Sequence, residues 1–287
     1  MRHIITLSTI PPRFAGIGHA LKALVNQSSR PEAVELYIPK SYRRFPQWSG
    51  SLPEVPEGVR IVRVEEDLGP ATKILPAAKA YRGQDVELLY VDDDQIFSRN
   101  WAKASLKLRQ KLPGTALCGQ AFLVSRYGFE WNGEPHLPRM LPVSPSVKLW
   151  RFFWRNTIKH AFPRNWNGVT MEAWPPTIGT AGYCDIAEGF CGVMVRPEFF
   201  DDAVFDIPPV VWAVDDVWLS GHLARRGIPI WADQKLVKIT TVIEVDQIFP
   251  LHKAVLDGVG REEANHACID HMRRTYGVWG GIATIST

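Results

Sequence analysis

The feature that most constrains the fold is the alternation of short β-branched runs with helix-type patterns over the first 125 residues. Between the runs, apolar residues recur at helical spacing. This order predicts an α/β fold with a mostly parallel sheet and helices on both faces. The predicted strands are Ile4–Ile10, Val34–Ile38, Val59–Val64, Val86–Val91 and Ala116–Ser125. The predicted helices are Ile17–Gln27, Ala71–Tyr81, in which Pro76 should cause a kink or a restart, and Trp101–Leu112.

The second half of the chain is less regular. Residues 126–182 are rich in Pro, Trp and Arg without clean periodicity, and we interpret them as an insertion or lid. We expect one domain over residues 1–287, with 232–287 as a C-terminal extension. Regular patterns return at strands Ile186–Arg196 and Pro229–Ala232 and at helices Asp215–Arg226 and Arg261–Tyr276.

Composition excludes several classes of protein. Hydrophobic residues make up 46% and charged residues 22% of the chain, which excludes an intrinsically disordered polypeptide. The formal net charge of +3 suits a phosphate-bearing ligand or an anionic membrane surface, and it is too small to indicate nucleic-acid binding.

Cysteine spacing and the N-terminus bear on the compartment. The four cysteines are widely spread and lack zinc-site spacing, so we expect free thiols in a reducing compartment. Pro11, Pro12 and Arg13 interrupt any apolar run of a secretory signal, and no run is long enough to span a bilayer. We therefore expect a cytoplasmic protein that can touch the inner face of the membrane.

The strongest local motif is the apolar run Leu88–Val91 followed by three aspartates, Asp92, Asp93 and Asp94. Carboxylates this close raise one another's pKa unless a cation compensates them. A hard divalent ion such as Mn²⁺ or Mg²⁺ takes oxygen ligands and can bridge to phosphates. The motif therefore favours a metal site over the alternative, a solvated acidic turn that caps the next helix.

A second motif, Asp67–Lys73, combines a Gly69–Pro70 turn with a lysine at a helix start. Helix N-termini bind anions, and a lysine there adds a charge suited to a diphosphate. The equally favoured alternative is an ordinary loop-to-helix junction with a surface lysine.

A third motif opens the helix at Asp215 with two carboxylates, Asp215 and Asp216. One of them could act as a general base on an acceptor hydroxyl, provided that it lies within hydrogen-bonding reach of the proton. Taken alone, the pair is more typical of an N-cap and a favourable partner of the helix dipole.

Two further segments leave alternatives open. The glycines of Glu188–Gly192 could let an acceptor sugar approach the backbone, with Glu188 and Gly189 contacting it, or could mark a bulged strand. As a helix, Lys148–His160 would place Trp150, Phe153 and Trp154 opposite its basic residues. That pattern fits an interfacial membrane helix, and hence a lipid-linked acceptor, or an amphipathic helix packed on the domain.

In their order along the chain, four segments resemble the landmarks of GT-A-fold glycosyltransferases, and most of all bacterial enzymes that build surface polysaccharides. The segments are Thr6–Arg13, Asp67–Lys73, Tyr90–Asp94 and Asp215–Leu219. The resemblance covers about the first hundred residues and 186–231 and leaves the insertion unmatched.

The resemblance implies a role for each motif. Asp94 would bind the metal ion, with Asp92 turned toward the ribose or a metal-bound water, and His252 is the best-placed additional metal ligand. Asp216 falls where inverting members carry their base, although Asp215 replaces the usual glutamate, so the choice between the two stays open. The nucleotide-binding residues would be Thr6, Thr9, Arg13, Asp67, Lys73 and Asp92.

The resemblance therefore implies metal-dependent transfer of a sugar from a nucleoside-diphosphate sugar to a hydroxyl of a glycan or lipid-linked acceptor. The donor is expected to be UDP-linked, as is usual in the family, and the reaction is expected to invert the configuration of the anomeric carbon. A nucleotidyltransferase would use similar aspartates but would release pyrophosphate. A non-catalytic carbohydrate-binding protein would use some of the eleven tryptophans as stacking platforms and would ignore metal and nucleotide.

Overall fold

The computed structural model describes residues 1–131, 134–144, 146, 165–166, 169–173, 177–254 and 258–281. The strands are β1 (His3–Ser8), β2 (Ala33–Pro39), β3 (Val59–Val64), β4 (Glu87–Tyr90), β5 (Gln95–Phe97), β6 (Ala116–Cys118), β7 (Ala121–Phe122), β8 (Leu141–Pro142), β9 (Asn165–Trp166), β10 (Val169–Ala173), β11 (Ile178–Thr180), β12 (Gly182–Cys184), β13 (Ile186–Ala187), β14 (Val193–Val195), β15 (Ile230–Ala232) and β16 (Ile239–Val242). The helices are α1 (Gly18–Val25), α2 (Leu75–Ala80), α3 (Trp101–Arg109), α5 (Asp215–Arg225), α6 (Ile243–Asp246) and α7 (Arg261–Tyr276).

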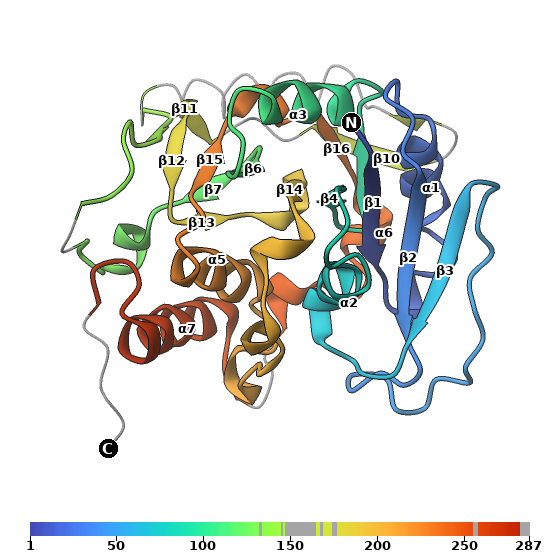
Figure 1. Cartoon of the computed structure of the whole chain (residues 1–287). Coiled ribbons are helices and arrows are strands. Elements are labelled where there is room, and N and C mark those ends of the chain that lie inside the picture. The colour runs from blue at the N-terminus through green and yellow to red at the C-terminus, as the bar shows by residue number, and fades with distance from the viewer. Residues whose placement is uncertain are drawn as a thin grey trace.

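An eight-stranded sheet forms the centre of the part of the molecule that the structure describes (Figure 1), in the order β12-β15-β6-β14-β4-β1-β2-β3. Four of its neighbouring pairs are parallel: β15 with β6, β4 with β1, β1 with β2, and β2 with β3. β14 runs antiparallel between β4 and β6, and β12 is antiparallel to β15. The predicted α/β class with a mostly parallel sheet is confirmed.

Helices cover both faces of this sheet, which explains why the residues of its central strands are buried on both faces. Successive side chains of a strand point to opposite faces. Ile5 and Leu89 belong to the core under α1 and α3, whereas Ile4 and Leu88 belong to the core under α2, α5 and α7. All four side chains are fully buried, as expected for parallel strands covered on both sides. On the second face, α5 and α7 lie side by side (Figure 1).

Two predicted strands are each divided by a glycine. Ala116–Ser125 becomes β6 in the main sheet and β7, which pairs with β13, and the chain turns at Gly119. A Cβ there would lie 3.2 Å from the backbone of Leu236 and Val237. Ile186–Arg196 becomes β13, the 3₁₀ helix η4 (Gly189–Cys191) and β14. Gly192 has φ +80°, and its Cβ would lie 2.3 Å from the Trp101 ring, so only glycine fits.

The predicted helix Ala71–Tyr81 is also two elements. A 3₁₀ helix, η2 (Gly69–Lys73), ends before α2 begins at Leu75, which places Pro76 in the first turn of α2. Proline is tolerated there because the first N–H groups of a helix have no intrahelical partner. The expected restart at Pro76 therefore occurs, and it leaves Lys73 on the separate 3₁₀ turn.

Outside the main sheet, β5, β16, β10 and β9 form a four-stranded sheet. It brings part of the predicted insertion, β10, against Ile239–Val242, a strand that the sequence patterns did not predict. The expected amphipathic segment 148–160 lies outside the described residues. Within the described ranges, no helix has the length and apolar character needed to cross a membrane.

Candidate functional site

A cavity of about 1080 Å³ opens at the carboxyl ends of β1 and β4. Sites for one small-molecule ligand occupy roughly 300–1,000 Å³, so this cavity is large enough to enclose a whole small molecule. Ligands of open α/β sheets bind at the carboxyl ends of the strands. The predicted motifs 67–73, 92–94 and 215–216 all contribute to its wall, together with Thr9, Arg13 and Glu188.

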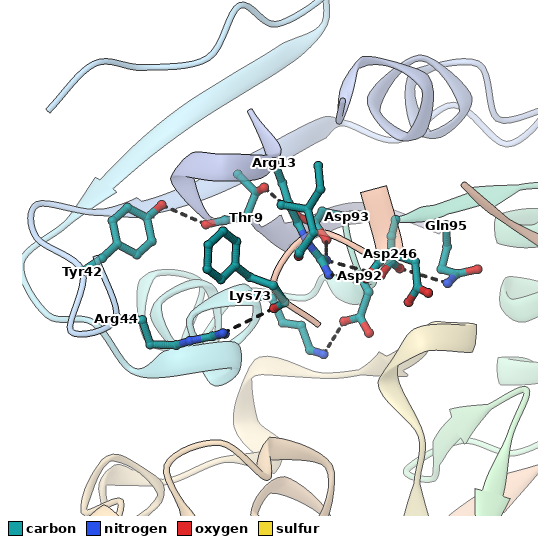
Figure 2. Close-up of polar contacts among 12 residues, drawn as sticks. Thr9, Arg13, Tyr42, Arg44, Lys73, Asp92, Asp93, Gln95 and Asp246 are labelled. Atoms are coloured by element: carbon teal, nitrogen blue, oxygen red, sulfur yellow. Dashed lines mark hydrogen bonds and ion pairs between the residues drawn. The ribbon is translucent and has the colours of Figure 1, made fainter. Parts of the chain in front are cut away.

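The middle aspartate of the acidic motif is held by the segment that follows β1 (Figure 2). The Thr9 hydroxyl donates to Asp93 Oδ2 at 2.5 Å, and Arg13 Nη1 donates to Asp93 Oδ1 at 2.6 Å. The other guanidinium nitrogens of Arg13 donate to the carbonyls of Ile248 at 2.9 Å and Asp246 at 3.3 Å. Thr9 and Arg13, predicted to bind the nucleotide, thus line the cavity but direct their side chains to Asp93 and to the C-terminal segment.

Thr6 does not share this position. It lies within β1, is fully buried, and does not line the cavity. The difference arises because Thr6 lies within β1, whose two faces are both covered, whereas Thr9 lies beyond the strand end, where the cavity opens.

Asp94 carries a buried and incompletely compensated charge. Its Oδ1 accepts from Gln95 Nε2 at 2.9 Å, and its Oδ2 lies 3.3 Å from Arg13 Nη1. Burial, reinforced by the charges of Asp93 and Asp92, raises the pKa of Asp94 to about 7. A divalent cation would relieve this cost, and Asp94 and Asp92 are the residues at the end of β4 that would hold it.

Lys73 joins the strand end to α5. Its ammonium nitrogen lies 2.6 Å from Asp92 Oδ1 and 2.9 Å from Asp215 Oδ2 (Figure 2 shows the first contact). The Lys73 side chain is only 4% exposed, so it is not the surface lysine of the alternative interpretation. Burial lowers its pKa, but Asp215 and Asp92 outweigh this and raise the pKa well above its usual range. The ammonium predicted to contact phosphates lines the cavity and is paired with two carboxylates.

Asp67 shapes the neighbouring loop. Its Oδ1 accepts from the backbone N–H of Gly69 at 2.9 Å, and its Oδ2 accepts from that of Arg43 at 2.8 Å. Burial raises the pKa of Asp67, against the effect of these two hydrogen bonds. Asp67 lines the cavity, and each of its carboxylate oxygens already accepts one hydrogen bond. These two hydrogen bonds tie the loops after β2 and β3 together.

Asp216 lies at the start of α5 and faces the cavity. The N-cap is Val214, and no side chain caps the helix, so neither aspartate is the cap that the sequence alone favoured. Asp216 Oδ1 accepts from the Gly189 N–H at 2.9 Å, and Oδ2 lies 3.5 Å from Arg261 Nη2. Burial, then the charge of Asp215, raises the pKa of Asp216 to about 7. A carboxylate with that pKa is suited to accept a proton at neutral pH.

Glu188 and Gly189 take different places. The Glu188 carboxylate lines the cavity, has no hydrogen bond to another described residue, and burial raises its pKa. Gly189 does not line the cavity; a Cβ on it would lie 2.7 Å from Lys73 Nζ and 3.0 Å from Asp216 Oδ1. Its role is therefore to let these two side chains pack closely, and direct contact with an acceptor is not available to it.

Four charged residues of the cavity wall were not identified from the sequence: Arg44, Arg126, Asp246 and Arg261. None of them belongs to a motif, and Arg261 is the first residue of the predicted helix Arg261–Tyr276. His252 lies in the 3₁₀ helix η9 (Leu251–Lys253), and its side chain lies outside what the structure describes. In the described part of the chain, no three His, Cys, Asp or Glu side chains are placed to hold a metal ion by themselves.

Comparisons with known proteins find similarity to solved structures only at low sequence identity. No family model and no curated protein matches this chain. Among solved structures, it is similar to residues 1–349 of S. aureus TarS in complex with UDP, at 13% identity and a TM-score of 0.38, over 81% of this chain and 58% of that one. A second structure of the same TarS segment gives 12% identity and a TM-score of 0.42 over 96% and 72%. The chain thus spans less than two thirds of the UDP-bound TarS chain.

Proposed function

We propose that this protein is a metal-dependent glycosyltransferase of the GT-A type. It would transfer a sugar from a nucleoside-diphosphate sugar to a hydroxyl of a glycan or lipid-linked acceptor. The proposed donor is UDP-linked, as is usual in the family that the sequence resembles. One observation supports this more than any other. A single cavity is walled by the carboxylates at the end of β4 and by those at the start of α5, and Lys73 bonds to both groups.

Asp94 and Asp92 are the proposed residues for Mn²⁺ or Mg²⁺. Mg²⁺ is commonly held by one or two carboxylates together with substrate phosphates, so the lack of a three-residue cage among the described residues agrees with an ion that arrives with the diphosphate. When bound, the ion would stabilise negative charge on the departing diphosphate. His252 stays a proposed additional ligand.

Asp216 is the proposed general base. It would take the proton of the acceptor hydroxyl while that oxygen bonds to the anomeric carbon, and the electron pair of the breaking carbon–oxygen bond would leave with the diphosphate. The Gly189 N–H and Arg261 hold the Asp216 carboxylate in position. Attack from the side opposite the leaving group gives inversion, and Asp215, which pairs with Lys73, would position rather than react.

The nucleotide is proposed to lie against the loops that follow β1, β2 and β3. Asp67 ties two of these loops, and Thr9 and Arg13 hold the third to the acidic motif. A bacterial surface polysaccharide as the product, and a peripheral membrane contact through 148–160, are further parts of the proposal that the described residues do not bear on.

A thermal-shift screen of nucleoside diphosphates with and without Mn²⁺, followed by donor-hydrolysis assays, tests the proposal. We expect stabilisation that requires both nucleotide and metal, and release of nucleoside diphosphate. Release of pyrophosphate would instead identify a nucleotidyltransferase. Glycan binding that is indifferent to metal and nucleotide would identify a carbohydrate-binding protein.

A further inference from the structure

The segment that follows α6 carries a strained and exposed aromatic residue. Phe249 has φ +47°, a backbone conformation that bulky side chains rarely adopt. In the part of the chain that the structure describes, Trp279 is the other residue besides glycine with a positive φ. Trp279 is buried in the core, so its packing offsets the strain, whereas Phe249 is 56% exposed. Burial therefore does not explain the conformation of Phe249.

Phe249 lies in the wall of the cavity, beside two aromatic residues of the loop after β2. The Phe249 and Phe45 rings meet edge to face, with their centroids 5.4 Å apart and their planes at 89°. The Tyr42 ring contacts Phe45 in the same way at 6.3 Å, and it also lines the cavity. An edge-to-face contact covers at most one face of a ring. Ring surface of Phe249 therefore stays open to a ligand.

Two arginines fix the backbone that presents this ring (Figure 2). Arg44 Nη2 donates to the Phe249 carbonyl at 3.3 Å. Arg13 donates through Nε to the Ile248 carbonyl at 2.9 Å and through Nη2 to the Asp246 carbonyl at 3.3 Å. Arg13 follows β1 and Arg44 follows β2, so the segment is fastened to two of the loops against which the nucleotide is proposed to lie. A surface that is fixed in advance costs less free energy to order when a ligand binds.

We propose that the base of the donor nucleotide stacks on the Phe249 ring. This inference rests on the proposed transferase function, because it takes a nucleotide as the donor. Nucleobases are flat, and aromatic side chains bind them face to face. The base is favoured over an acceptor sugar because Phe249 is held by Arg44 and Phe45 of the loop after β2, whereas the proposed general base, Asp216, lies on α5. Backbone strain is typical of residues that position a ligand.

The test compares UDP with 5,6-dihydro-UDP in calorimetric titrations of the full chain with Mn²⁺. The dihydro analogue keeps the hydrogen-bonding edge of uracil, but its saturated ring is puckered and stacks poorly. We expect wild type to prefer UDP by about tenfold. Phe249→Leu should bind UDP about tenfold more weakly than wild type and should lose this preference, whereas Phe249→Tyr should keep it. A preference in Phe249→Leu equal to that of wild type would overturn the inference.

Controls separate stacking from a general loss of structure. Leu52 is also an exposed apolar residue but does not line the cavity, so Leu52→Ala should bind both nucleotides as wild type does. Melting temperatures in EDTA check folding, and Phe249→Met repeats the comparison should Phe249→Leu fold poorly. An equal loss of affinity for both nucleotides would place the ring against the ribose or the diphosphate and overturn the inference.

Failure of this inference can be distinguished from failure of the proposed function. Wild type that does not bind UDP in Mn²⁺ would overturn both. Wild type that binds UDP, with Phe249→Leu binding it equally well, would overturn the stacking role and leave the transferase proposal in place.

Discussion

The ammonium nitrogen of Lys73 lies 2.9 Å from Asp215 Oδ2, and both side chains are only 4% exposed. The same nitrogen lies 2.6 Å from Asp92 Oδ1. One buried cation thus links the end of β4, where the metal is proposed, to the helix that carries the proposed base.

Replacing Lys73 with Met should therefore leave the buried carboxylate of Asp215 and the partly exposed carboxylate of Asp92 without their cation. Removing one partner of a buried ion pair costs about 3–5 kcal/mol. We expect Lys73→Met to lower the free energy of unfolding in urea by about that amount, and Lys73→Met with Asp215→Leu to recover part of it. A single variant as stable as wild type would show that the contact is not energetically important.

Asp216→Asn should separate binding from chemistry. General-base catalysis contributes about 10²- to 10⁴-fold, so transfer should fall by at least about 10²-fold while UDP binding in Mn²⁺ stays close to wild type. Full turnover by this variant would remove Asp216 from the reaction. Asp215→Asn is the comparison, and because Asp215 pairs with Lys73 it should lose stability as well as rate.

The pKa of Asp216, raised to about 7 by burial, predicts the pH dependence of both activity and stability. A base must be deprotonated, so kcat/KM should fall as the pH drops below about 7. The folded-state pKa lies above the unfolded value of about 3.9. Between these two pH values the folded state therefore binds a proton on Asp216 that the unfolded state does not bind. This proton uptake stabilises the folded state, and the stabilisation is lost as the pH rises through about 7. The difference between wild type and Asp216→Asn in urea unfolding from pH 4 to 8 measures it; a pH-independent difference would contradict the assignment.

Gly189→Ala should impair transfer through packing alone. The added Cβ would lie 2.7 Å from Lys73 Nζ and 3.0 Å from Asp216 Oδ1, and Lys73 is held by two carboxylates and has little room to move. We expect a loss of stability of about 1–3 kcal/mol and a fall in turnover with nucleotide binding retained. Gly18→Ala is the matched control, because a Cβ at Gly18 has no neighbour within 4 Å.

Asp94→Asn should abolish the Mn²⁺-dependent part of the thermal stabilisation by UDP. The variant keeps the shape of the side chain and removes the charge that burial makes costly in the absence of a cation. The metal-free protein should be at least as stable as wild type, since a buried and poorly compensated carboxylate is lost. Undiminished metal-dependent stabilisation would exclude Asp94 as a ligand.

Much of the fold could be predicted because its signals are local. Val59–Val64 and Arg261–Tyr276 match β3 and α7 at both ends, and the acidic motif follows a buried strand as expected. The division at Gly119 and Gly192 was not predictable, because the backbone and the Trp101 ring that exclude a Cβ there come from distant segments.

The sequence by itself determined the class of fold, the edge of the sheet that carries the carboxylates, and the residue types gathered there. These features could be predicted because the patterns of strands and helices are set by residues that are close together in the chain. Only the tertiary structure decided what each side chain contacts. It enclosed Lys73 between two carboxylates, turned Thr9 and Arg13 to Asp93, and brought Arg261 to Asp216. The physical reason is that the charge and hydrogen-bonding state of a buried polar group depend on groups folded against it from elsewhere in the chain.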